Sequence, residues 1–153
     1  MKADTNSVMP GVTEDTVPNP RTIYHRTKLE AEGIVAAAAS PDLSVRIIRL
    51  SRCFPEPAPL MALYRLHRGV DYRDVAAAHL LASDWRGSAC ETFVISGYTP
   101  FLPSDCADLK RDAAAVIRSR APNVAEAFDA RGWPLPKSID RVYDGSKAEQ
   151  MLG

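Results

Sequence analysis

Two side chains near the start of the chain, Tyr24 and Lys28, have the types and the spacing of a proton-transfer pair. Residues four apart lie on the same face of an α-helix, so a helix through this stretch brings the phenol and the ammonium together. A neighbouring positive charge favours the phenolate and lowers a tyrosine pKa from its ordinary value of about 10. Tyr24 is therefore a candidate general acid or base. The alternative is an incidental pair on a solvated helix face.

The helix that must carry this pair is predicted over about residues 20–39. Asn19 is a favourable N-cap residue, and Pro20 suits the first helical position. The body of the helix is rich in alanine and carries an apolar stripe, formed by Leu29, Ile34 and Val35.

Two strands are predicted, and the first follows this helix directly. Residues 43–50 are rich in β-branched side chains, and residues 91–97 form the second candidate. A helix, a short turn and a strand make up the αβ half of a βαβ unit, which indicates a parallel sheet. The loop over residues 51–57 leaves the carboxyl end of the first strand. Ligands bind at that end in open α/β sheets.

The rest of the chain is predicted to be mostly helical. Residues 1–19 are polar and rich in turn-forming residues, which is typical of a surface loop. Asp74 is the expected N-cap of a helix over residues 75–83, and a catalytic acid is the alternative role for this residue. Further helices are expected at about residues 60–66, 105–120, 124–131 and 146–152. A doubly wound sheet needs more strands than the two predicted here.

Composition favours an ordinary globular domain and argues against some partners. The 153 residues carry 19 basic and 19 acidic side chains, so no positive surplus points to nucleic acid or to an anionic membrane. The three cysteines have no metal-ligand spacing, and an odd count suits a reducing compartment. No apolar run is long enough to span a bilayer, and no signal-peptide pattern is found. We expect a cytoplasmic protein without a metal site.

Several motifs, in one order along the sequence, carry a resemblance to a known family. They are Pro20-x-x-x-Tyr24-x-x-x-Lys28-x-x-x-Glu32, the stretches 46–56 and 68–79, Ile95-Ser96-Gly97, and the last segment from Tyr143 onward. Together they resemble the catalytic helix and the later segments of the extended short-chain dehydrogenase/reductases, the NAD-dependent epimerase/dehydratase group. The likeness is collinear from about residue 14 onward, which makes it more specific than the Tyr/Lys spacing alone.

The resemblance implies roles for particular residues. Tyr24 would exchange a proton with a hydroxyl or keto group of a small, sugar-like substrate, while hydride passes to or from NAD or NADP. Lys28 would hold the nicotinamide ribose and lower the tyrosine pKa. Backbone groups around Cys53 and Phe54 would contact the nicotinamide. Two arginines would bind the substrate, or are otherwise ordinary surface residues: Arg68 and Arg73.

The resemblance also implies a fold and an assembly. We expect a partial Rossmann-like, doubly wound α/β fold over residues 20–153, with a small helical substrate-binding part and a homodimer through the Tyr24–Lys28 helix. The Gly-rich turn that binds the pyrophosphate in this family is absent, so we expect the N-terminal nucleotide-binding half to be lacking and strand edges to be exposed. Two other hypotheses stay open: a non-catalytic remnant that oligomerises or binds a partner, and a small binding module.

Overall fold

The computed structural model describes residues 11–153, which form an α/β domain with six α-helices and two strands. This confirms the expected α/β class. In sequence order the elements are α1 (Ile23–Ala37), β1 (Val45–Leu50), α2 (Ala58–Arg65), α3 (Tyr72–Asp84), β2 (Cys90–Ile95), the 3₁₀ turn η1 (Pro103–Asp105), α4 (Cys106–Arg120), α5 (Pro122–Ala130) and α6 (Ser146–Leu152). Of the predicted 1–19 surface loop, residues 1–10 lie outside the described part, and residues 11–19 form neither helix nor strand.

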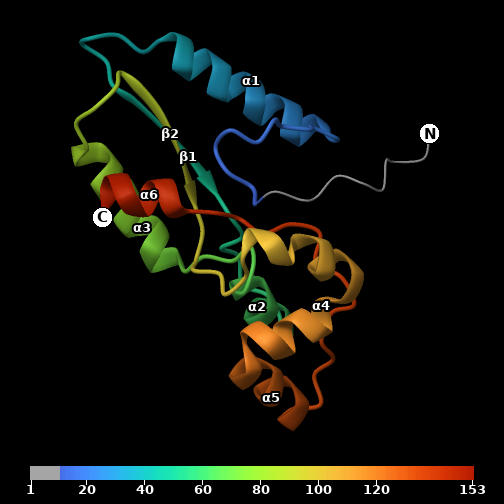
Figure 1. Ribbon diagram of the computed structural model, residues 1–153. Helices are drawn as coiled ribbons and strands as arrows, with labels where there is room; N and C mark the ends of the chain where they lie inside the picture. Colours follow the sequence, from blue (N-terminus) through green and yellow to red (C-terminus); the bar gives the residue numbers. More distant parts are fainter. Residues whose placement is uncertain (1–10) are drawn as a thin grey trace.

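The two strands form a parallel sheet, as the helix-turn-strand order predicts. Their register runs from Val45 opposite Cys90 to Leu50 opposite Ile95. Helices cover both faces of the sheet, with α1 on one side and α3 and α6 on the other, as Figure 1 shows. In the same view α4 and α5 lie beyond the carboxyl ends of the strands.

Two apolar clusters stabilise the protein, one beside the sheet and one around α4 and α5. One lies between the sheet, α3 and α6, and its buried members are Val70, Ala78, Phe93, Ile95 and Ala148. The other holds α4 and α5 against the segments around them and is formed by Leu66, Phe101, Leu109, Ala113, Ile117, Ala125, Ile139 and Val142. Helix α1 contributes no buried residue to either cluster. It is therefore the most weakly packed of the helices on the sheet.

The two outer edges of the sheet differ. Along β2 the amide of Val94 donates to Glu14 Oε1 at 2.6 Å, and Lys147 Nζ donates to Thr92 O at 3.0 Å. Side chains thus cover the edge of β2. The outer edge of β1 pairs with no strand in the described part of the protein. The exposed strand edge expected from the sequence is therefore present, and it is that of β1.

Residues 68–70 lie between two segments that follow the strands, one at Arg52 after β1 and one at Gly97 after β2. Arg52 N donates to Arg68 O at 2.8 Å, and Gly97 N donates to Gly69 O at 2.9 Å. This close approach requires two glycines. A Cβ on Gly69 would lie 2.9 Å from the carbonyl carbon and oxygen of Tyr64, and one on Gly97 would lie 2.7 Å from Gly69 O.

Several predicted helix boundaries are wrong. Helix α1 begins at Ile23 and not near residue 20, because the side chain of Thr22 accepts the N-terminal hydrogen bond from His25 N. Helix α3 begins at Tyr72 with Asp71 as its N-cap, so Asp74 lies in the first turn. No helix among residues 11–153 is long and apolar enough to cross a bilayer.

Candidate functional site

The predicted Tyr24–Lys28 pair forms on the first two turns of α1. Lys28 Nζ lies 5.7 Å from the centroid of the Tyr24 ring, which is a cation–π arrangement. The ring also stands edge-on to His25, with centroids 6.1 Å apart. Tyr24 is 64% exposed, and neither its hydroxyl nor Lys28 Nζ has a hydrogen-bond partner within residues 11–153. The pair is therefore assembled but open to water.

A charged contact that the sequence did not predict anchors this helix. In β1, Nε and Nη2 of Arg49 both donate hydrogen bonds to the Glu32 carboxylate, and the Nη2–Oε2 distance is 2.8 Å. The same guanidinium donates from Nη1 to Glu14 O at 3.1 Å. Both side chains are about three-quarters buried. An arginine within a largely apolar strand was the signal for such a contact.

The loop after β1 carries the two residues proposed for the nicotinamide. Cys53 is half-buried and packs against the apolar cluster between the sheet and α3. Phe54 is 69% exposed. This loop leaves the carboxyl end of β1, as expected, but no described contact joins it to Tyr24 or Lys28.

Arg68 takes part in a stack that the sequence did not reveal. The guanidinium carbons of Arg68 and Arg52 lie 4.3 Å and 5.3 Å from the centroid of the Tyr64 ring. Arg68 Nε is buried without a hydrogen-bond partner among the described residues, and its Nη1 lies 4.0 Å from Asp140. Arg68 Nε is thus a buried donor that no described residue satisfies.

Arg73, the other predicted substrate ligand, is engaged within its own helix turn. Its Nε donates to Asp71 Oδ1 at 2.9 Å, and its guanidinium carbon lies 5.9 Å from the centroid of the Tyr72 ring. Hydrogen bonds from the side chain and the backbone of Arg73 lower the pKa of Asp71 well below its ordinary value. Arg73 therefore pairs with Asp71, the N-cap residue of α3, and not with the stack that contains Arg68.

A buried histidine in the same region was also missed. His67 is 5% exposed, and its Nδ1 lies 2.9 Å from Arg141 O. Burial lowers its pKa to about 4, and this outweighs the opposing effect of the Arg141 carbonyl. His67 is neutral at pH 7 and fixes the segment that precedes α6. Its partner is 74 positions away, so no local pattern in the sequence could have signalled the contact.

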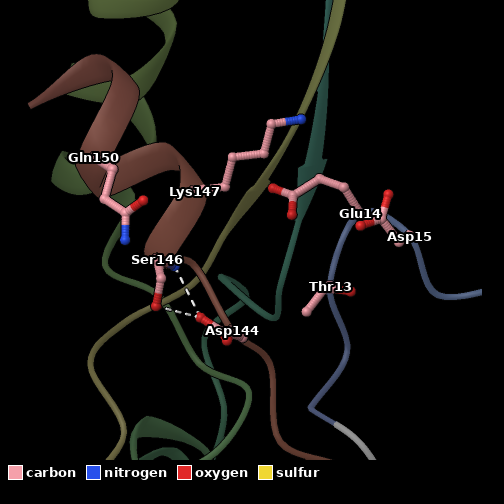
Figure 2. Close-up of a pocket in the computed structure, with 7 residues that line it drawn as sticks. All are labelled: Thr13, Glu14, Asp15, Asp144, Ser146, Lys147 and Gln150. Atoms are coloured by element: carbon pink, nitrogen blue, oxygen red, sulfur yellow. Dashed lines mark hydrogen bonds between the residues drawn. The ribbon is translucent and has the colours of Figure 1, made fainter.

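A small hollow lies between α6 and the segment before α1. It has a volume of about 240 Å³ and is lined by Thr13, Glu14, Asp15, Asp144, Ser146, Lys147 and Gln150, as shown in Figure 2. Asp144 accepts hydrogen bonds there from the amide and the hydroxyl of Ser146. None of the predicted site residues lines this hollow.

Three helices of the described part are poorly suited to bind the pyrophosphate of NAD or NADP at their N-termini, whereas α2 and α5 have no side-chain cap. That group needs a helix N-terminus with free backbone N–H donors. The N-termini of α1, α3 and α6 each have a side-chain oxygen in this position, from Thr22, Asp71 and Asp144. Two of these groups are carboxylates, which repel a phosphate.

The site is thus a set of separate parts. Tyr24 and Lys28 meet on α1, whereas Cys53, Phe54, Arg68 and Arg73 belong to the loops around the carboxyl end of the sheet. No family model, curated protein or solved structure matches this protein.

Proposed function

We propose that this protein supplies the proton-transfer part of an NAD(P)-dependent oxidoreductase, epimerase or dehydratase. The observation that carries this proposal is the Tyr24–Lys28 pair, with Nζ 5.7 Å from the ring centroid on one helix face. In this role Tyr24 gives a proton to, or takes one from, a hydroxyl or keto group of a small, sugar-like substrate in the cytoplasm. Lys28 keeps a positive charge beside the phenol and favours its ionised form.

The arrangement of the elements supports a partial doubly wound fold around this pair. Helix α1 leads into β1, and the loop with Cys53 and Phe54 leaves the carboxyl end of that strand. In this proposal the loop borders the nicotinamide, as in the extended short-chain family. Hydride transfer then needs the pyrophosphate to be held elsewhere than at the N-termini of α1, α3 and α6, because side-chain oxygens already accept hydrogen bonds from their backbone N–H groups.

Arg68 is the better substrate ligand of the two arginines. Its Nη1 lies no closer than 4.0 Å to the carboxylate of Asp140, and stacking on Tyr64 fixes the plane of its guanidinium. A fixed guanidinium suits an anionic or hydroxyl-rich substrate. Arg73 is already paired with Asp71, so its contribution would require that pair to open.

Exposed apolar side chains on α1 support the proposed homodimer. Ile23 is 76% exposed and Ile34 is 71% exposed, which is costly for a helix in water. A second copy that packs on α1 would cover them without blocking the sheet.

Titration of the purified protein with NAD and NADP tests the function. We expect saturable binding that Lys28→Ala weakens. Lys110→Ala, on an exposed site of α4, is the matched control and should bind as the unchanged protein does. No binding by the isolated protein at millimolar cofactor would overturn the proposal for this polypeptide alone.

A non-catalytic binding or oligomerising domain is the second candidate. The exposure of Tyr24 favours it, because a working proton-transfer site is usually shielded from water. Absence of cofactor binding together with a stable dimer in sedimentation would support this second function.

A further inference from the structure

Helix α4 is broken at Asp112, and its two halves fold back on each other. Asp112 has an extended backbone, with φ −151° and ψ 77°. A straight helix would separate Asp105 and Arg120 by about 22 Å along its axis. Instead, Arg120 donates from Nε to Asp105 Oδ2 and from Nη2 to Oδ1, both at 2.8 Å. Figure 1 shows the same reversal, because the ribbon of α4 turns back before it reaches α5.

The local sequence does not require this break. Residues 109–116 contain neither Gly nor Pro, and three of them are consecutive alanines, the residue that favours helix most strongly. The buried residues Leu109, Ala113 and Ile117 are spaced four apart, so a continuous helix would place all three on one face. The break therefore depends on contacts that are made in the folded protein.

Residues 137–139 form a strap that holds the break open. Lys137 O accepts a hydrogen bond from Ala113 N at 3.1 Å. Ile139 N donates a hydrogen bond to Leu109 O at 2.9 Å. In a continuous helix Ala113 N would donate to Leu109 O, because helical hydrogen bonds join residues four apart. The strap thus occupies both partners of one helical hydrogen bond, and such an insertion is a known cause of a kink.

Three further contacts favour the bent form. Asp112 Oδ1 accepts a hydrogen bond from Ala115 N at 3.1 Å and so caps the second half of α4. Asp105 and Arg120 form their ion pair across the reversal. Ile139 is 2% exposed and lies in the apolar cluster around α4 and α5. A straight α4 loses these contacts but regains helical hydrogen bonds through the break, so the two forms differ in their bonding partners.

The strap leads directly to Arg68. Asp140 follows the strap, and its Oδ1 lies 4.0 Å from Arg68 Nη1. The next residues are anchored, because Arg141 O lies 2.9 Å from His67 Nδ1 and Tyr143 N donates to His67 O at 2.8 Å. Release of the strap therefore frees Asp140 from its place beside Arg68, while the anchored residues stay where they are.

We propose that α4 is a conformational switch with a bent state and a straight state. In the bent state, which the structure shows, the strap occupies the break and Asp140 lies beside Arg68. In the straight state Ala113 N donates to Leu109 O, and the released strap withdraws Asp140 from the Arg68 guanidinium. The switch goes beyond the proposed redox function. Its test needs neither cofactor nor substrate, so the failure of one proposal leaves the other intact.

Hydrogen exchange in the unchanged protein gives the first test. The Ile139 amide loses its acceptor when α4 straightens. The Ala113 amide exchanges Lys137 O for Leu109 O and stays bonded. We therefore expect the Ile139 amide to exchange about tenfold or more faster than the Ala113 amide, after correction for their intrinsic rates. Nuclear magnetic resonance of isotope-labelled protein resolves the two amides.

Variants at Asp112 shift the balance between the two states. Asp112→Ala removes the cap and adds helix propensity, so exchange of Ile139 should rise about tenfold while Ala113 stays protected. The carbon chemical shifts at this position should move from extended toward helical values. Asp112→Asn keeps a capping oxygen and should keep the protection of Ile139 within about twofold. Asp108→Ala, the same change within a helical part of α4, is the matched control and should also stay within about twofold.

A second pair of variants tests the ion pair across the reversal. Arg120→Met removes this pair, so exchange of Ile139 should rise about fivefold. Arg118→Met breaks the pair with Asp129 of α5 and should leave exchange of Ile139 within about twofold. The Ser51 amide donates to the carbonyl at the end of β2, far along the chain from α4, and should not change in any variant.

Four outcomes would overturn the proposal. Equal protection of Ile139 and Ala113 in the unchanged protein would show that the break does not close. Joint loss of their protection in Asp112→Ala would indicate local unfolding instead of a straight helix. Unchanged exchange of Ile139 in both Asp112→Ala and Arg120→Met would show that the break is rigid. An equal rise at Ser51 would assign the effect to unfolding of the whole protein.

Discussion

Arg49 and Glu32 form a two-pronged ion pair, 2.8 Å at its shortest, that joins β1 to α1. Because α1 buries no residue, this pair and the N-cap at Thr22 are the main polar contacts that position Tyr24 and Lys28.

Breaking this pair should loosen α1. We expect Arg49→Met to lower the free energy of unfolding by about 1–2 kcal/mol, because the Glu32 carboxylate, about three-quarters buried, loses its charge-assisted hydrogen bonds. Urea denaturation measures the change. Arg118→Met, which breaks an exposed pair with Asp129, is the control and should lower the free energy of unfolding by less than Arg49→Met does. Equal costs would show that Arg49 contributes no more than a surface pair.

His67 should make stability depend on pH. Its folded pKa of about 4 lies below the ordinary value of 6.5, so the folded state favours neutral imidazole. This contribution is complete above about pH 6.5 and is lost as the pH falls toward 4, amounting to about 3 kcal/mol. Unfolding free energies at several pH values measure it. His67→Gln does not titrate, so the difference between the two proteins should shrink with falling pH. A constant difference would contradict the assignment.

Two glycines should respond in opposite directions to alanine. Gly69→Ala places a Cβ 2.9 Å from the Tyr64 backbone, so we expect a loss of about 1–3 kcal/mol. Gly33 lies inside α1 with nothing within 4 Å of a Cβ. Gly33→Ala should therefore stabilise the protein by about 0.5–1 kcal/mol through helix propensity. Thermal unfolding of both variants provides the comparison, and a stabilising Gly69→Ala would refute the close packing at residues 68–70.

Tyr24→Phe should separate proton transfer from binding. The variant keeps the ring under Lys28 and removes only the hydroxyl. In any preparation that shows redox activity we expect kcat to fall by about 100-fold or more. Cofactor affinity should stay within about twofold. Full activity in the variant would exclude Tyr24 as the acid or base.

The sequence predicted the presence and type of the strands and helices better than the residues at which they begin and end. Strands were expected at residues 43–50 and 91–97 and are found at Val45–Leu50 and Cys90–Ile95, because β-branched runs bias the backbone locally. The N-caps were placed three residues from their true positions in α1 and α3. Several neighbouring residues could serve as caps, and only the folded geometry selects the oxygen that reaches a free N–H.

The sequence by itself determined the α/β class and the Tyr24–Lys28 pair, because helix periodicity and strand propensity act over a few residues. Only the tertiary structure decided the Arg49–Glu32 pair, the burial of His67 and the different coverage of the two sheet edges. These features join residues 17 to 80 positions apart. Such contacts depend on how the polypeptide folds back on itself, and no local pattern encodes that path.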